Sequence, residues 1–257
     1  MLSLTGGGPK ELLPVAGVPV LIRVLRECAS SGITDALIVI APDKQAIVEL
    51  VSPLAGTDDV PASIRFVVQR EARGLADAIR LGRDFAGTEP LAVALPDNLF
   101  TGDAPALRQV IDEHSATGKN VVAVVEISAA EAKKRGPTAI YPGALCGDRY
   151  DILSIPEKRE RTATFTTGGA ESAFTAVGRF VFNPEVFDAI DETDQLLAAG
   201  QELDDVPLMR LLLGRGLLVG RRVRGRFFDV GLVDGLRDAD EPLARQEKTP
   251  FHIVPGH

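Results

Sequence analysis

Short apolar runs alternate with amphipathic stretches along the first half of the chain. The runs have the length of strands and are continuously apolar, which is typical of strands buried on both faces, and the stretches between them place apolar residues at helical spacing. This alternation predicts βαβ units with right-handed crossovers and a mostly parallel sheet, and so an α/β fold. The predicted strands cover residues 36–41, 64–68, 91–95 and 121–127, and the predicted helices cover residues 18–31, 43–50, 74–85 and 104–117.

The second half of the chain is less regular. A polar stretch rich in Arg, Thr and Gly predicts a loop, and the last residues lack periodicity and predict a tail. No internal repeat is visible. The predicted elements are strands at 152–155, 175–182, 217–219 and 228–231, a helix at 206–213, a loop at 157–170 and a tail from 249.

The charge balance argues against nucleic acid as a partner. The chain has 257 residues, with 28 basic and 36 acidic side chains and a net charge of −8. A protein that binds duplex nucleic acid usually has a basic excess, because its affinity comes from neutralised phosphates. An anionic ligand would therefore have to meet a few placed cations, backbone N–H groups or a metal.

Cysteine content and hydropathy predict a cytoplasmic protein with no membrane partner. Two cysteines do not form a disulfide framework, so a reducing compartment fits, and Cys28 stands in a helical pattern that favours a small buried apolar role. No run approaches the ~20 apolar residues of a membrane span. The first residues lack the basic start and apolar block of a signal peptide.

Candidate site residues follow the apolar runs, since ligands of parallel α/β sheets bind beyond the carboxyl ends of the strands. Gln69 follows the second run, Asp97 follows the third, and Asp229 stands at a late strand end. The two aspartates could share Mg²⁺, which one or two carboxylates hold together with phosphate oxygens and water. A strand-end Asp is also a common turn residue or helix cap. Lys10 and Lys158 are candidate cations for an anionic ligand, and the alternative for each is a solvated surface charge.

The string PKELLPV at residues 9–15, followed by GVPV at 17–20, carries a resemblance to a known family. It resembles the segment after the glycine-rich loop in sugar-phosphate nucleotidyltransferases, and most closely that of bacterial UTP–glucose-1-phosphate uridylyltransferases. Weaker strings fall in family order over residues 9–237. The resemblance implies a Rossmann-like three-layer fold of the GT-A-like type. It also implies one nucleotidyltransferase domain at 1–240, with a nucleotide-binding half at 1–128 and a sugar-phosphate-binding half at 129–240, and a tail at 241–257.

Several strings imply the nucleotide site by this resemblance. The Lys of the PKE string contacts phosphates in the family, which implies the same for Lys10. A Gln at a strand end and the Gly of a following Gly-Leu pair read the nucleotide base, which implies Gln69 and Gly74. The Asp of a Pro-Asp pair and the Asp of a late D-x-G string bind Mg²⁺, which implies Asp97 and Asp229 as metal ligands.

The sugar-phosphate site is implied by later strings. Gly136 matches a sugar-site glycine of the family, although the preceding Tyr is replaced by Arg. Glu157 and Lys158 match the EKP string, whose Glu binds sugar hydroxyls and whose Lys binds the sugar phosphate, although the Pro is replaced. Gly178, in the string VGRF, matches a glycine that lets the backbone approach closely.

The implied reaction is attack of a sugar 1-phosphate oxygen on the α-phosphorus of a nucleoside triphosphate, with release of pyrophosphate. It requires alignment of two polyanions and neutralisation of charge more than covalent work by the protein. The resemblance implies Lys10, Asp97 and Lys158 as catalytic residues, Mg²⁺ as cofactor, and UTP with glucose 1-phosphate as substrates. Relatives commonly form dimers or tetramers, which implies a homo-oligomer.

Three questions stay open: the base, the sugar and the start of the chain. The substitutions around residues 157–159 leave room for a sugar other than glucose. Glu11 is typical of the uridylyltransferases, whereas Ala76 and Asn98 favour the thymidylyltransferase relatives, which would use dTTP. The family also opens with a strand and a G-x-G-T-R loop that cradles the triphosphate. Residues 1–8 match only the stretch downstream of that loop, and their triple glycine favours a structural turn.

The resemblance therefore implies that the first strand of the sheet is missing, which would leave neighbouring strand edges unpaired. Two explanations are compatible with this expectation. Either the natural protein starts upstream of Met1, or the chain is a short paralogue that has lost catalysis and binds a nucleotide sugar or sugar phosphate as a regulatory protein. Retention of the other site positions favours the first explanation.

Overall fold

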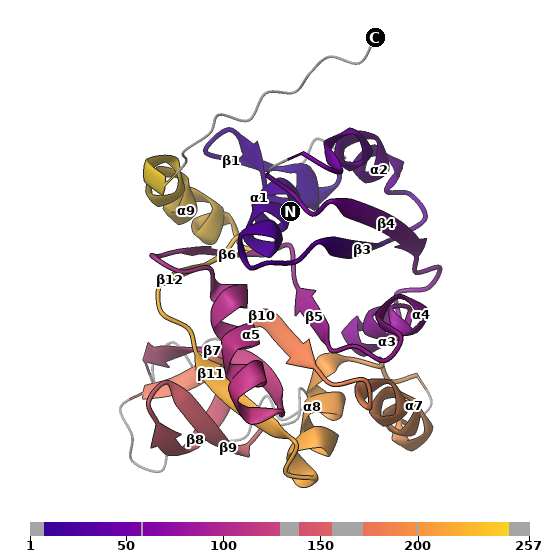
Figure 1. Ribbon diagram of the computed structural model, residues 1–257, viewed down its shortest axis with the longest axis vertical. Helices are drawn as coiled ribbons and strands as arrows, with labels where there is room; N and C mark the ends of the chain where they lie inside the picture. The colour runs from indigo at the N-terminus through magenta and orange to yellow at the C-terminus, as the bar shows by residue number, and fades with distance from the viewer. Residues whose placement is uncertain (1–7, 58, 129–138, 156–171, 199, 247–257) are drawn as a thin grey trace.

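A mixed sheet of six strands forms the centre of the fold (Figure 1). The computed structural model describes residues 8–57, 59–128, 139–155, 172–198 and 200–246. In spatial order the strands of the sheet are β5 (Leu91–Ala94), β10 (Ser172–Phe182), β7 (Asn120–Ser128), β11 (Leu218–Arg222), β9 (Arg149–Ser154) and β8 (Ala139–Cys146).

The α/β fold is confirmed, and the directions of its strands are mixed. β7 and β11 are parallel, whereas β10 runs antiparallel to both β5 and β7, so β5, β7 and β11 point the same way. β8 and β9 are antiparallel because a tight hairpin joins them across Gly147, whose φ is +65°.

A separate pair of strands lies outside this sheet. β3 (Asp35–Ile40) pairs in parallel with β4 (Ser63–Val68). In the described part of the chain, β3 has β4 as its one strand partner and β5 has β10. The residues of β5 are all only half-buried, as are residues 36–39 of β3, although their continuously apolar sequence predicts burial on both faces.

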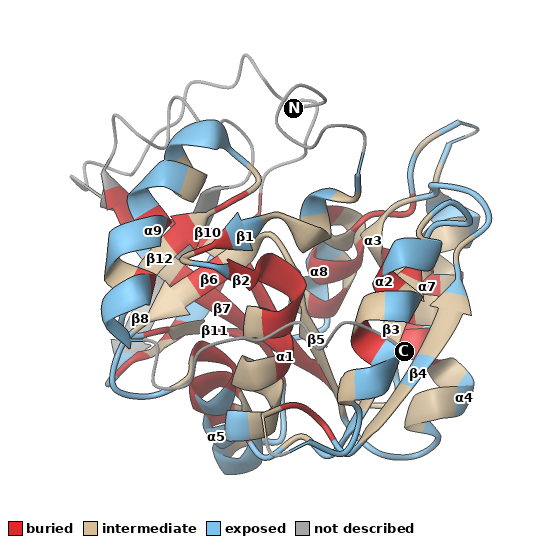
Figure 2. Cartoon of the chain, turned by 90° about the horizontal axis from the view of Figure 1, so that it is seen from above, coloured by how far each residue is buried: buried red, intermediate tan, exposed pale blue. Residues whose placement is uncertain are grey.

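Helices cover both faces of the central sheet and make three layers (Figure 2). Along β7, Val121 and Ala123 pack in the same apolar cluster as residues of α5 (Ala106–Thr117). Val122 and Val124 point to the opposite face and pack in the largest cluster, because successive side chains of a strand alternate. That cluster is completed by residues of α7 (Val186–Leu196) and α8 (Asp205–Gly214).

The helices of the first half largely follow the predicted pattern. α1 (Val20–Ser30) and α2 (Gln45–Val51) share an apolar cluster with β3 and β4. α1 begins after residue 18 because 18–19 form the short strand β2, which pairs with β1 (Pro14–Val15). The predicted helix at 74–85 is divided at Gly82 into two short helices, since glycine is a poor helix former. These are α3 (Leu75–Arg80) and α4 (Arg83–Ala86), and the 3₁₀ turns are η1 (Lys10–Leu12) and η2 (Ser52–Leu54).

The expected tail at 241–257 is wrong at its first residues. α9 (Val233–Gln246) continues past residue 240, because Ala239 and Leu243 stand four residues apart on one buried face. This face packs on β12 (Arg226–Asp229) and on β6 (Asn98–Thr101), which pair antiparallel.

The two cysteines lie in different environments. Cys28 packs against the apolar cluster beneath α1, and burial raises the pKa of its thiol to about 12. Cys146 is exposed at the end of β8. Neither forms a disulfide.

No helix in the described ranges is both long enough and apolar enough to cross a bilayer.

Candidate active site

The turn between β5 and β6 carries Asp97. Its Oδ2 accepts a hydrogen bond from Lys10 Nζ at 3.1 Å, and its Oδ1 accepts one from Asn98 Nδ2 at 2.7 Å. Its backbone oxygen accepts from Val230 N at 2.9 Å. The side chains of Lys10 and Asp97 are 43% and 31% exposed, so this carboxylate can reach a ligand from solvent.

Asp229 ends β12, directly beside the Asp97 turn. The β6–β12 register places it opposite Asn98. A Cβ built on Gly231 would lie 3.0 Å from Asp229 Oδ1 and 3.4 Å from Asp97 Oδ2, so both carboxylates converge on one point. The two aspartates therefore lie near each other, and their role as metal ligands stays a prediction.

The donor set at this point fits Mg²⁺. Two carboxylates offer the hard oxygen ligands that Mg²⁺ takes, and the remaining positions are normally filled by phosphate oxygens and water. Within the described ranges, no group of three or more His, Cys, Asp or Glu side chains is placed to hold a metal. Asp97 and Asp229 form a pair that could hold the ion while substrate completes its shell.

Lys10 lies in η1 and places its ammonium beside the same Asp97 oxygen that faces Asp229. The ion pair is half-exposed, so it contributes little stability. In this arrangement Lys10 balances the charge of the Asp97 carboxylate. Glu11, the next residue, is engaged elsewhere, because its carboxylate pairs with Lys44 at 3.3 Å.

Gln69 and Gly74 are brought together at the end of β4. Gln69 Nε2 donates to the backbone oxygen of Gly74 at 3.2 Å and to Asp77 Oδ2 at 2.9 Å. Because the amide nitrogen is used in this way, the Oε1 atom is the end of the side chain left to accept from a ligand. Gly74 has a φ of +115°, and a Cβ there would lie 2.5 Å from the backbone oxygen of Leu203.

Asp77 is a buried partner of Gln69 that the sequence did not single out. Its side chain is buried and orients Gln69, while Arg80 neutralises its charge. A usable signal was present, since Asp77 stands on the apolar face of α3 between the buried residues Ala76 and Ile79. A charge on such a face needs partners.

Gly178 forms the floor of the Asp97 turn. It has a φ of +61° at an irregularity of β10, and its backbone oxygen accepts from Leu95 N at 2.8 Å. A Cβ there would lie 2.8 Å from Leu95 Cβ and 3.0 Å from Asn98 Cγ. The backbone of Gly178 therefore approaches the turn of Asp97 too closely for a side chain at this position.

Arg179, the next residue, was missed as well. It is fully buried and its guanidinium binds the carboxylate of Glu27 from α1. A single Arg inside the otherwise apolar strand sequence FTAVGRFVF was the available signal.

Three predicted sugar-site residues lie outside the described ranges. These are Gly136, Glu157 and Lys158. Their roles stay predictions.

The comparisons with known proteins agree with this fold. The Nucleotidyl transferase family model matches residues 1–246. The chain therefore belongs to the nucleotidyl transferase family, and it is an enzyme of that class.

Two similar relatives carry the same enzyme name. The chain is 30% identical over 248 residues to the UTP–glucose-1-phosphate uridylyltransferase of Staphylococcus epidermidis RP62A, covering 90% of this chain and 83% of that one. It is 29% identical to the enzyme of the same name from Bacillus subtilis strain 168, covering 96% and 87%.

Solved structures share the fold. A UDP-glucose pyrophosphorylase complexed with UDP-glucose has a TM-score of 0.77 at 22% identity, covering 93% of this chain and 91% of that one. A UTP-bound UGPase from Acinetobacter baumannii has a TM-score of 0.76 at 21% identity, covering 96% and 90%.

Proposed function

We propose that this chain transfers a uridylyl group from UTP to glucose 1-phosphate, forming UDP-glucose and pyrophosphate. The observation that carries the proposal is the convergence of Asp97 and Asp229 on one point, with Lys10 beside them. The names of the most similar relatives support the choice of substrates.

The chemistry is a single displacement at phosphorus. A phosphate oxygen of glucose 1-phosphate forms a bond to the α-phosphorus of UTP, and the bond from that phosphorus to the oxygen bridging to the β-phosphate breaks. Pyrophosphate leaves with that bonding electron pair. The attacking oxygen is already anionic near neutral pH, so no general base is required, and the protein contributes alignment and charge neutralisation.

Asp97 and Asp229 would hold a Mg²⁺ ion in this reaction. When bound, the ion supplies positive charge against the phosphate oxygens. Lys10 would turn from Asp97 toward the phosphates and supply a second positive charge. Lys158 is proposed to bind the phosphate of the sugar substrate.

The base-binding part of the proposal rests on Gln69. Its Oε1 atom is oriented by the two bonds of its Nε2 atom and would accept from the imide N–H of uracil. Thymine presents the same imide edge, so Gln69 alone does not separate UTP from dTTP. We propose UTP rather than dTTP because the two relatives described above are uridylyltransferases.

The test is release of pyrophosphate by the purified full chain with Mg²⁺, glucose 1-phosphate and either UTP or dTTP. We expect turnover with UTP, and a loss of about 10²-fold or more in kcat/KM for Asp97→Asn and for Asp229→Asn, as for loss of a group that stabilises transferring charge. Asp112→Asn is the matched control, because it removes an exposed carboxylate on α5 that pairs with Arg108.

Each other outcome contradicts part of the proposal. A higher kcat/KM with dTTP would assign the chain to the thymidylyltransferase type. Binding of UTP or UDP-glucose by calorimetry with no turnover would assign a binding or regulatory role. Equal losses in Asp97→Asn and Asp112→Asn would remove Asp97 from the site.

A further inference from the structure

The guanidinium of Arg179 is the most completely bonded polar group near the site. It is 0% exposed, and its Nε and Nη2 atoms donate to the two carboxylate oxygens of Glu27 at 3.1 and 2.7 Å. Nη1 donates to the backbone oxygens of Leu95 and Gly178 at 2.9 and 3.0 Å. Nη2 also donates to the backbone oxygen of Asn98 at 2.7 Å. All five N–H donors of a guanidinium can be used in this way.

Two of these partners flank Asp97 in the sequence. Leu95 and Asn98 are the two ends of the turn that carries this carboxylate, and one rigid planar group holds both of their carbonyls. From the other side, Val230 N donates to the backbone oxygen of Asp97 itself. The turn is thus fixed from the sheet interior by Arg179 and from β12 by Val230.

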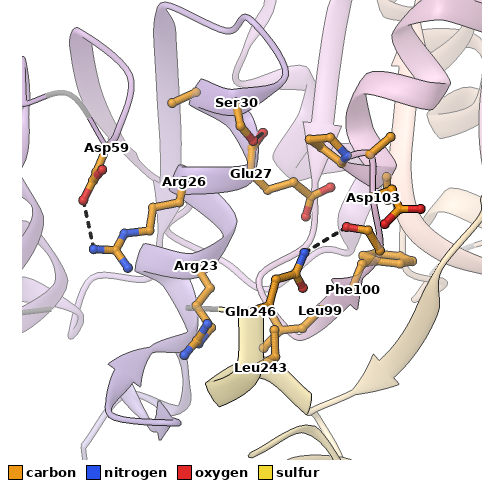
Figure 3. A pocket seen from close by; sticks show the side chains of 15 residues that line it. Arg23, Arg26, Glu27, Ser30, Asp59, Leu99, Phe100, Asp103, Leu243 and Gln246 are labelled. Atoms are coloured by element: carbon orange, nitrogen blue, oxygen red, sulfur yellow. Dashed lines mark hydrogen bonds and ion pairs between the residues drawn. The ribbon is translucent and has the colours of Figure 1, made fainter. Parts of the chain in front are cut away.

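Glu27 fixes the orientation of Arg179. Its carboxylate binds the guanidinium in a two-bond arrangement and also accepts from Leu107 N, at the start of α5, at 2.8 Å. It lines a cavity of about 500 Å³ between α1, the start of α5, β6 and α9 (Figure 3). Its side chain is 13% exposed, so the charge keeps some contact with solvent and the desolvation of the pair is incomplete.

We propose that Arg179, oriented by Glu27, is a positioning residue for Asp97 and sets the metal affinity of the site without touching substrate. The proposal rests on the proposed function, because it takes Asp97 as a metal ligand. A lysine at this position would keep the charge but could not span the two carbonyls, since its ammonium lacks the planar fork of a guanidinium. A pair that served stability alone would leave the metal affinity unchanged in any variant that folds.

The test uses two variants and a matched control. Arg179→Lys is the conservative variant, and Glu27→Met with Arg179→Met replaces the whole pair by apolar side chains of similar length, which often leaves a buried pair's stability unchanged. Arg221→Lys is the control. Arg221 lies in β11 of the same sheet and pairs with Glu113 and Asp148, at 3.2 and 3.4 Å, far along the sequence from the Asp97 turn.

The first readout is binding of Mn²⁺ in the presence of UTP, measured by the paramagnetic resonance of the free ion. We expect both Arg179 variants to bind about 10–100-fold more weakly than the wild type, as is typical when an outer partner of a metal ligand is removed. The control is expected to bind like the wild type. Wild-type affinity in a cooperatively folded double variant would overturn the proposal.

The second readout is amide hydrogen exchange, which does not depend on activity. We expect the Val230 N–H to exchange faster in both variants relative to the Val223 N–H, which donates to Val124 O at 3.0 Å beside the six-stranded sheet. Equal acceleration of both amides would show a general loss of stability and overturn the proposal. If the wild type turns over no nucleotide, the proposed function fails, and the exchange of Val230 still decides whether Arg179 holds the turn.

Discussion

Replacing Gly178 by alanine is the sharpest single perturbation of the Asp97 turn. The residue has a φ of +61°, a left-handed conformation that costs an L-residue about 1–2 kcal/mol. The new Cβ would also lie 2.8 Å from Leu95 Cβ and 3.0 Å from Asn98 Cγ, and overpacking of this kind costs about 1–3 kcal/mol. The two effects together predict a loss of about 2–5 kcal/mol in the free energy of unfolding.

A second glycine separates the two effects. Gly118 ends α5 with a φ of +65°, and a Cβ there meets nothing within 4 Å. Gly118→Ala should therefore show only the conformational part, about 1–2 kcal/mol. The difference between the two losses in the free energy of unfolding measures the contact of the new methyl group with the Asp97 turn.

Thermal unfolding and pyrophosphate release measure the outcome. Each kcal/mol lowers the Tm of a chain of this size by about 2–4 °C. Because the added methyl group pushes on Leu95 and Asn98, we also expect Gly178→Ala to lose about 10²-fold in kcat, as for a small misplacement of a catalytic group. Gly118→Ala should keep its kcat. Equal stability losses in the two variants, or full activity in Gly178→Ala, would refute the reasoning.

Three further results are expected. Lys10→Met should lower kcat/KM by about 10²–10³-fold. It should change the free energy of unfolding by less than about 1 kcal/mol, because its ion pair is half-exposed. A large loss of stability in urea unfolding would contradict this. Burial raises the pKa of Cys28 from 9.0 to about 12, so the folded protein should lose stability as the pH rises from 9.0 toward 12, and Cys28→Ala should lose less in urea titrations across that range. Burial raises the pKa of Asp148, but hydrogen bonds from Arg222 and Arg224 outweigh this effect and hold the pKa below its usual value. The stability that the Asp148 carboxylate contributes should therefore be present above the usual carboxyl pKa. It should be lost as the pH falls through the lowered pKa of the folded state. Asp148→Asn should remove about 1.5–3 kcal/mol at neutral pH and flatten the acid part of the stability curve.

Local patterns could be predicted where neighbouring residues decide the structure. The apolar runs that became β3, β4, β5 and β7 were visible because a strand buried among other elements needs a continuous apolar sequence. The positions of Asp97 and Asp229 could be inferred because Asp97 follows such a run and Asp229 stands at a predicted strand end. α9 was missed because its many charged residues hide the buried pair Ala239 and Leu243.

Long-range pairing could not be predicted from the sequence. Asp229 reaches Asp97 only because β12 pairs with β6, and no local sequence pattern predicts that register. The same holds for Arg179, whose partners come from α1 and from the β5–β6 turn. A buried charge indicates that partners exist, but its sequence context does not say which segments supply them.

In the described part of the chain, β3 and β5 belong to different sheets, and this has a consequence for local unfolding. A two-stranded sheet is marginal by itself, so β3 and β4 depend on the apolar cluster that they share with α1 and α2. Such a unit is expected to unfold locally at a lower free energy than the six-stranded sheet. Gln69 stands at the end of β4 and Asp97 at the end of β5, so a nucleotide that binds both would join the two units. Ligand binding should therefore slow local unfolding of β3 and β4 more than that of β7, and the nucleotide becomes part of what makes the fold cooperative.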